Sequence, residues 1–99
     1  MRSKLLADVP EDKVFYLYDG RILKNLLELK EALEDMEDYV FNHHVNPERN
    51  DFCNWIEFVI LDKDLANELR RVKTKQSTIK KIKLAIVREL KKRTAAKEI

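Results

Sequence analysis

The sequence contains a single glycine, Gly20, among its 99 residues. Loops that cradle phosphate groups need several glycines, so glycine-rich nucleotide-binding motifs are excluded. The single cysteine, Cys53, cannot form an internal disulfide and is typical of a protein in the reducing cytoplasm. No apolar run is long enough to cross a bilayer, and the apolar run near the N-terminus is too short for a signal sequence. We therefore expect a soluble, cytoplasmic protein of one domain that folds without disulfides or metals.

Charged residues are abundant but unevenly distributed. The net charge is only +2, although Asp, Glu, Lys and Arg make up 38% of the chain. Residues 1–69 carry 8 Lys and Arg against 16 Asp and Glu, a net charge of −8, whereas residues 70–99 carry 12 against 2, a net charge of +10. The sequence therefore predicts an acidic body with a basic C-terminal end. Abundant Lys and Glu, with little Gln and Met, also resemble a thermophile's composition.

The most apolar stretch is predicted to be a central helix that starts after Asn50 or Asp51, either of which can cap it. At about 100° per residue, one stripe of this helix is formed by Phe52, Trp55, Ile56 and Val59. Further apolar residues widen the stripe on both sides, namely Cys53, Phe58 and Ile60. A helix that is apolar over more than half its circumference must be covered on several sides, so we expect the other elements to pack around it.

Near the N-terminus, two short runs rich in aromatic and β-branched residues flank Asp19-Gly20. This pattern favours a β-hairpin closed by a two-residue type I′ turn, and an extended loop is the alternative. In the predicted register Leu17 faces Ile22, and Phe15 lies on the same side.

Apolar residues at helical spacing predict two helices before the central one. Asn25 and Glu28 have the form of a cap with its capping-box partner, and the inward residues that follow are Leu26, Leu29, Leu33 and Met36. A short second helix is expected at about residues 38–45, capped by Asp35 or Glu37 and broken by residues 46–49. Its inward residues are predicted to be Val40, Phe41, His44 and Val45.

Two more helices are predicted after the central one. The first is capped by Asp62 or Asp64, and its apolar face comprises Leu65, Ala66, Leu69 and Val72. Residues 73–76 form a short polar joint, after which Ser77 or Thr78 is expected to cap the last helix. Within about 80° of arc, that helix presents an apolar stripe of Ile79, Ile82, Ile86 and Leu90.

The last helix is also strongly basic. Its candidate residues for binding an anionic partner are Lys80, Lys81, Lys83, Arg88, Lys91 and Lys92. Leu84 breaks the pattern because it projects from the middle of the cationic face. Solvated lysines that complement the acidic body, contacts with nucleic-acid phosphates and contacts with an anionic membrane surface are three competing interpretations. The acidic body would repel phosphates, and the absence of aromatic residues from this helix argues against base stacking and against membrane anchoring.

These elements predict a mainly α fold: a compact single domain of four to five helices with a short N-terminal β-hairpin. Residues 1–13 lack periodicity and are interpreted as a lead-in segment, disordered in part. Residues 14–76 form the helical core domain, and residues 77–99 form the basic amphipathic C-terminal helix.

Four residues of types that ligate metals or act as nucleophiles lie close together in the sequence: His43, His44, Asp51 and Cys53. Adjacent residues on a helix diverge by about 100°, so His43 and His44 cannot both face one ion, and Cys53 has no C-x-x-C partner. The apolar surroundings expected for Cys53 would oppose formation of a thiolate. We therefore expect no catalytic residues, no cofactor and no metal, and hence a protein that is not an enzyme.

Several short motifs together resemble a known family. They are Phe15-x-Leu17-x-Asp19-Gly20, Asn25-Leu26-x-Glu28-Leu29, Phe41-x-x-His44-Val45, Asn50-Asp51-Phe52-x-x-Trp55-Ile56 and Asp62-x-x-Leu65-Ala66. The family is one of small helical domains of unknown function, found in archaea and bacteria alone or attached to other proteins. The resemblance covers about residues 14–72 and implies a helical accessory domain. It implies no activity and no catalytic or ligand residues, and it does not extend to the basic helix.

Four of the motif residues are interpreted as structural: His44, Asp51, Phe52 and Trp55. Phe52 and Trp55 would fill the centre of the fold, while His44 and Asp51 are predicted to share a hydrogen bond that braces residues 46–49. Our leading functional hypothesis is a non-enzymatic interaction or adaptor module whose acidic body and basic helix present two surfaces of opposite sign. It would bind a protein partner or a second copy of itself, as in a homodimer joined acidic body to basic helix. Nucleic-acid binding through the last helix is the alternative.

Overall fold

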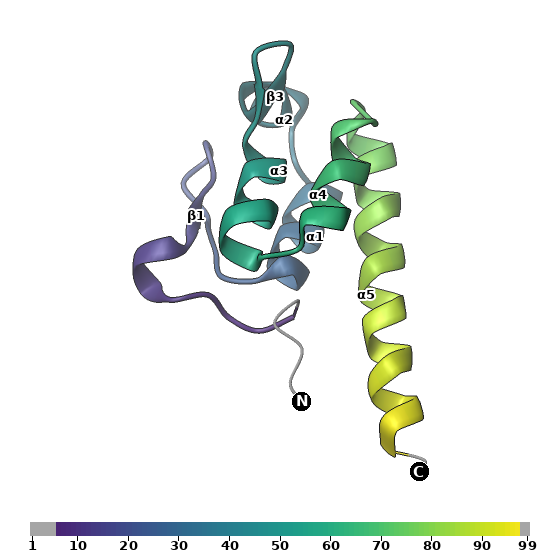
Figure 1. Ribbon diagram of the computed structural model, residues 1–99. Helices are drawn as coiled ribbons and strands as arrows, with labels where there is room; N and C mark the ends of the chain where they lie inside the picture. The colour runs from purple at the N-terminus through teal and green to yellow at the C-terminus, as the bar shows by residue number, and fades with distance from the viewer. Residues whose placement is uncertain (1–5, 98–99) are drawn as a thin grey trace.

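The computed structural model describes the backbone of residues 6–97 and the side chains of residues 6–92. The predicted fold class is confirmed, because most described residues are helical and a short antiparallel hairpin precedes the helices. The elements are η1 (Glu11–Lys13), β1 (Phe15–Tyr16), β2 (Ile22–Leu23), α1 (Leu26–Glu34), α2 (Asp38–His44), β3 (Val45–Asn46), β4 (Arg49–Asn50), α3 (Asp51–Trp55), η2 (Ile56–Ile60), α4 (Lys63–Arg70) and α5 (Lys75–Lys97). Figure 1 shows α5 running along one side of the molecule, with its C-terminal part extending past the other elements.

The centre of the core is α3, as predicted. Phe52, Cys53 and Ile56 have no exposed surface, and Asn50 caps the helix by accepting a hydrogen bond from the Cys53 amide at 3.1 Å. The expectation that Phe58 widens the buried stripe is wrong, because its side chain is 68% exposed. The backbone changes to a π-helix at η2. In a π-helix, with its i→i+5 hydrogen bonds, the rotation about the axis per residue is smaller than in an α-helix, so the side chains that follow point in other directions than an α-helix would give them.

The N-terminal hairpin is present, but its register differs by one residue from the prediction. The cross-strand pairs are Phe15 with Leu23 and Tyr16 with Ile22. The loop has three residues rather than two, because the Leu17 carbonyl accepts from the Gly20 amide at 2.9 Å and Gly20 adopts a φ of +99°. Ile22, predicted to face Leu17 on the packed side, is therefore 51% exposed.

The structure confirms Asn25 as the cap of α1 and, of the two candidates for α4, selects Asp62. Asn25 accepts from the Glu28 amide at 2.8 Å, and the Glu28 carboxylate accepts from the Lys24 amide at 2.7 Å. Asp62 accepts from the Leu65 amide at 3.0 Å. The bonds to Asn25 and Asp62 satisfy amide groups that have no partner within their own helix, so each cap fixes where its helix begins.

Residues 46–49, predicted to break the helix, follow the end of α2 at His44 and form the turn end of a second hairpin, β3–β4, with Pro47 and Glu48 between its strands. Its pairs are Val45 with Asn50 and Asn46 with Arg49. Asn46 closes the turn, because its side-chain oxygen accepts from the Glu48 amide at 3.0 Å. The hairpin delivers the chain to the start of α3, which follows it directly.

Helix α5 begins earlier than predicted. Thr74 is its cap, because its hydroxyl accepts from the Ser77 amide at 3.1 Å, whereas Ser77 and Thr78 lie inside the helix. Ile79, Ile82 and Ile86 are buried, in the part of α5 that packs on α1 and α4. Leu90, predicted to complete this stripe, is 48% exposed.

The lead-in segment is only partly described. Residues 1–5 lie outside the described residues, and so does their predicted disorder. Further along, the Val9 amide donates to the Lys24 carbonyl at 2.8 Å, and the Trp55 indole donates to the Lys13 carbonyl at 2.8 Å. These two bonds hold the segment before β1 against the body.

Candidate functional site

The predicted hydrogen bond between His44 and Asp51 is present, and it belongs to a larger network. The His44 side chain is almost fully buried, and its Nδ1 lies 2.9 Å from Asp51 Oδ2. Its other ring nitrogen, Nε2, accepts from the Tyr18 amide at 3.0 Å. Because Nε2 accepts, the imidazole is neutral and carries its proton on Nδ1, which donates to Asp51.

The surroundings of His44 favour this neutral form. Burial lowers the pKa of His44, while the hydrogen bond and charge of Asp51 oppose that effect. Asp51 is itself held by the Arg49 side chain, whose Nε lies 3.2 Å from its carboxylate. Both ring nitrogens are thus occupied by partners from the first hairpin and from α3. His44 has no free lone pair with which to act as a general base or to ligate a metal.

The other candidates for chemistry, Cys53 and His43, are also held by the surrounding protein. Cys53 is fully buried, and desolvation raises the pKa of its thiol to about 11, so a reactive thiolate does not form near neutral pH. His43 stacks on Tyr18 with ring centroids 3.8 Å apart. Across the described residues, no group of three or more His, Cys, Asp or Glu is arranged to hold a metal ion.

The two aromatic residues interpreted as structural lie in the core, as expected. Phe52 contacts the rings of Phe15 and His44, each with centroids 5.2 Å apart. Trp55 is 7% exposed and makes an edge contact with Phe15 at 5.7 Å. With the network described above, these contacts tie the first hairpin to α2 and α3.

The six candidate cations of α5 do not form one surface. Lys81 pairs with Glu68 of α4 at 3.7 Å, and Lys83 pairs with Glu34 of α1 at 3.3 Å, so both complement the acidic body. The other four are exposed and have no ion-pair partner in the part of the chain that the structure describes: Lys80, Arg88, Lys91 and Lys92. These four are free to meet an anionic partner.

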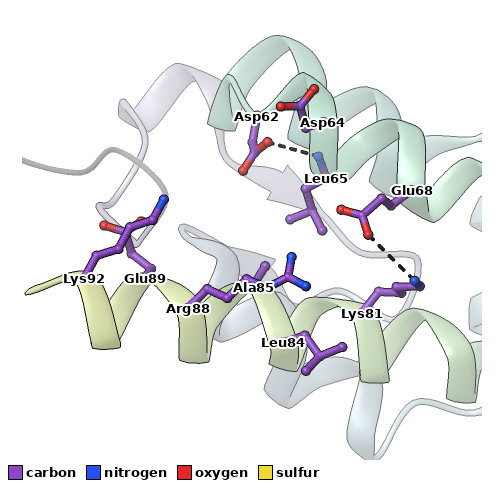
Figure 2. A pocket seen from close by; sticks show the side chains of 10 residues that line it. All are labelled: Asp62, Asp64, Leu65, Glu68, Lys81, Leu84, Ala85, Arg88, Glu89 and Lys92. Carbon is purple, nitrogen blue, oxygen red and sulfur yellow. Dashed lines mark hydrogen bonds and ion pairs between the residues drawn. The ribbon is translucent and has the colours of Figure 1, made fainter.

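A groove of about 240 Å³ separates α4 from α5. Figure 2 shows the side chains of Lys81, Arg88 and Lys92 extending from α5 into it. Four carboxylates also line it: Asp62, Asp64 and Glu68 from the α4 side, and Glu89 from α5 itself. Because both signs of charge line this groove, it does not select an anionic ligand.

Sequence reasoning treated Leu84 as an anomaly and missed Val87, yet both are 45% exposed on α5. Lys80, Leu84, Val87 and Lys91 follow one another at spacings of four, three and four residues. On a helix these positions fall within about 60° of arc. We call them the α5 outer face: two apolar residues in the middle and one lysine at each end. The spacing was visible in the sequence. The sequence did not show that no other described residue covers this face.

No family model, curated protein or solved structure matches this chain. Within the described residues, no helix is long and apolar enough to cross a membrane. The inference of function therefore rests on the geometry of the chain itself.

The α5 outer face combines exposed apolar side chains with exposed cations. Exposed Leu and Val side chains gain free energy when a partner covers them, and the flanking lysines attract opposite charge. The best-formed polar constellation, around His44, is closed and holds three elements together. Of the two regions, only the outer face is open to a partner.

Proposed function

We propose that this protein is a non-enzymatic interaction module that binds a partner protein through the α5 outer face. The observation that carries the proposal is the exposure of Leu84 and Val87, at 45% each, on a helix whose opposite side is buried in the core. Surface helices usually keep such a central position polar, and exposed apolar residues rimmed by charge are typical of protein-binding sites.

The proposal that the protein is not an enzyme is supported by the state of its chemically versatile side chains. Both ring nitrogens of His44 have protein partners, and the thiol of Cys53 is buried with a raised pKa. The burial of Cys53 as a free thiol also supports the proposal of a cytoplasmic location, where such thiols stay reduced. Membership of the small helical domain family remains a proposal that rests on the sequence motifs alone.

Nucleic-acid binding through α5 is the competing function, and two observations disfavour it. Lys81 and Lys83 are already paired with carboxylates of the body. The centre of the outer face is apolar, and Leu84 and Val87 cannot neutralise a phosphate or stack on a base. The same two residues would contribute directly to a protein interface.

The experiment uses a displayed library of helix-length peptides with no charge bias, selected against the full chain. The variant Leu84→Gln/Val87→Gln keeps the helix propensity of α5 and removes only the apolar centre of the face. We expect enriched peptides that bind the natural chain and not this variant. A library that yields no such peptide would contradict the proposal.

Duplex DNA and single-stranded RNA are titrated into the same proteins at low and moderate salt. The variant Lys80→Gln/Lys91→Gln serves as the second comparison. Nucleic-acid binding that falls steeply with salt, is lost in the lysine variant and survives in Leu84→Gln/Val87→Gln would establish the competing function instead.

A further inference from the structure

The α5 outer face has the pattern of one side of a helix pair. Its four residues span about 16 Å along the helix axis, and their spacing of four, three and four residues matches the seam along which two helices pack. Leu84 and Val87 occupy the two inner positions of this seam, and Lys80 and Lys91 occupy the two outer ones. A straight partner helix can therefore follow the whole face.

A second copy of α5 does not fit this seam. In an antiparallel pair centred between Leu84 and Val87, Lys80 of each copy lies opposite Lys91 of the other. In a parallel pair, each lysine lies opposite its own equivalent. Both arrangements place like charges at both ends of the contact, which destabilises the pair.

The charge of the α5 outer face instead specifies the opposite charge on its partner. Lys80 and Lys91 are exposed and have no ion-pair partner within the described part of the chain. A carboxylate at each end of the contact would pair with them, while two apolar side chains covered Leu84 and Val87. The neighbouring α4–α5 groove, whose edge shares Leu84 with the outer face, carries four carboxylates beside its three cations. An acidic partner therefore meets less repulsion on the outer face than in the groove.

We infer that the partner element is an acidic amphipathic helix of another protein, an inference that rests on the proposed function. It places two apolar residues over Leu84 and Val87, and Glu or Asp residues against Lys80 and Lys91. The contact covers about three turns of helix, so its area is small and its affinity moderate.

The test reverses the charge of the outer face and measures whether the charge of the selected peptides reverses with it. Lys80→Glu/Lys91→Glu changes two exposed side chains, and the matched control Lys63→Glu/Lys73→Glu makes the same change in net charge at two exposed lysines outside α5. Each full-length protein is selected against the displayed library, after its melting temperature has been compared with that of the natural chain. If Lys80→Glu/Lys91→Glu folds poorly, Lys80→Gln/Lys91→Gln replaces it.

We expect the natural chain and the control to enrich peptides with two apolar residues on one helical face and acidic residues beside them. The charge-exchanged protein should bind those peptides about tenfold more weakly or worse and should enrich basic peptides instead. With the Gln variant, we expect the acidic preference to disappear without a basic one taking its place.

Three results would overturn this inference. Peptides that need Leu84 and Val87 but are neutral, basic or extended would retain the proposed function and refute the acidic helix. Self-association of the natural chain that is abolished by Leu84→Gln/Val87→Gln would make a second copy the occupant. A failure to obtain any peptide that depends on Leu84 and Val87 would remove the proposed function together with the inference.

Discussion

Replacing His44 with Ala tests whether this side chain is part of the architecture. The substitution removes a hydrogen bond to the Asp51 carboxylate at 2.9 Å and the acceptor of the Tyr18 amide at 3.0 Å. It also removes a ring that contacts Phe15 and Phe52 with centroids 5.0 and 5.2 Å away.

The magnitude follows from these contacts. A hydrogen bond to a charged group contributes about 1.5–3 kcal/mol, a neutral one about 1 kcal/mol, and lost ring contacts about 1 kcal/mol more. Asp51 remains partly exposed and keeps Arg49, which offsets part of the loss. We expect His44→Ala to lower the free energy of unfolding by about 3 kcal/mol, which lowers the melting temperature by roughly 10–20 °C.

The assay is urea unfolding at neutral pH, followed by the fluorescence of Trp55, the only tryptophan. His43→Ala is the matched control, because its exposed ring only stacks on Tyr18 and makes an edge contact with His44 at 4.9 Å, and should contribute less than about 1 kcal/mol. A loss for His44→Ala that is no larger than the control's would refute the structural role and leave His44 available for function.

Three further predictions follow from single features of the fold. Burial keeps the His44 pKa below its ordinary value, so as the pH falls below about 6.5 the unfolded chain binds a proton before the folded chain does. The urea midpoint of unfolding should therefore drop between pH 7 and pH 5, and it should drop by less in His44→Gln. Gly20→Ala should cost about 1–2 kcal/mol through its positive φ alone, because nothing lies within 4 Å of the added carbon; an unchanged midpoint would contradict that φ. A chain ended at Lys75 loses three buried isoleucines, worth about 5 kcal/mol or more, and should show no cooperative melt near that of the full chain.

The sequence was sufficient wherever a local chemical signal decided the structure. The cap Asn25 could be recognised, and the caps of α3 and α4 could be narrowed to two neighbouring candidates each, because such side chains accept from an amide three residues further on. The structure selects Asn50 and Asp62. Burial of the central helix could be predicted because it is apolar around most of its circumference.

The sequence was insufficient where several local conformations differ little in energy. A two-residue and a three-residue loop both suit Asp19-Gly20, and choosing the second shifts the hairpin register by one residue. Thr74, Ser77 and Thr78 are all competent caps by residue type, yet Ser77 and Thr78 lie inside the helix and the Thr78 hydroxyl donates to the Thr74 carbonyl at 2.8 Å. Strands of two residues, as in β3 and β4, are too short to show alternation.

The candidate site was likewise predictable from the sequence only in part. The six cations of α5 were identifiable by composition, but which of them pair with the body depends on where α1 and α4 place Glu34 and Glu68. The exposure of Val87 likewise depends on which side of α5 faces the core. Periodicity within one chain does not specify whether the remaining side of α5 is covered.

The central claim is that the apolar centre of the α5 outer face binds a protein. The most direct measurement is the dissociation constant of an enriched peptide for the natural chain and for Leu84→Gln/Val87→Gln, by titration calorimetry. Each side chain is 45% exposed, so covering it should contribute about 1 kcal/mol, and the two together about 2 kcal/mol. The account predicts roughly 30-fold weaker binding by the variant. Equal dissociation constants for the two proteins would contradict it.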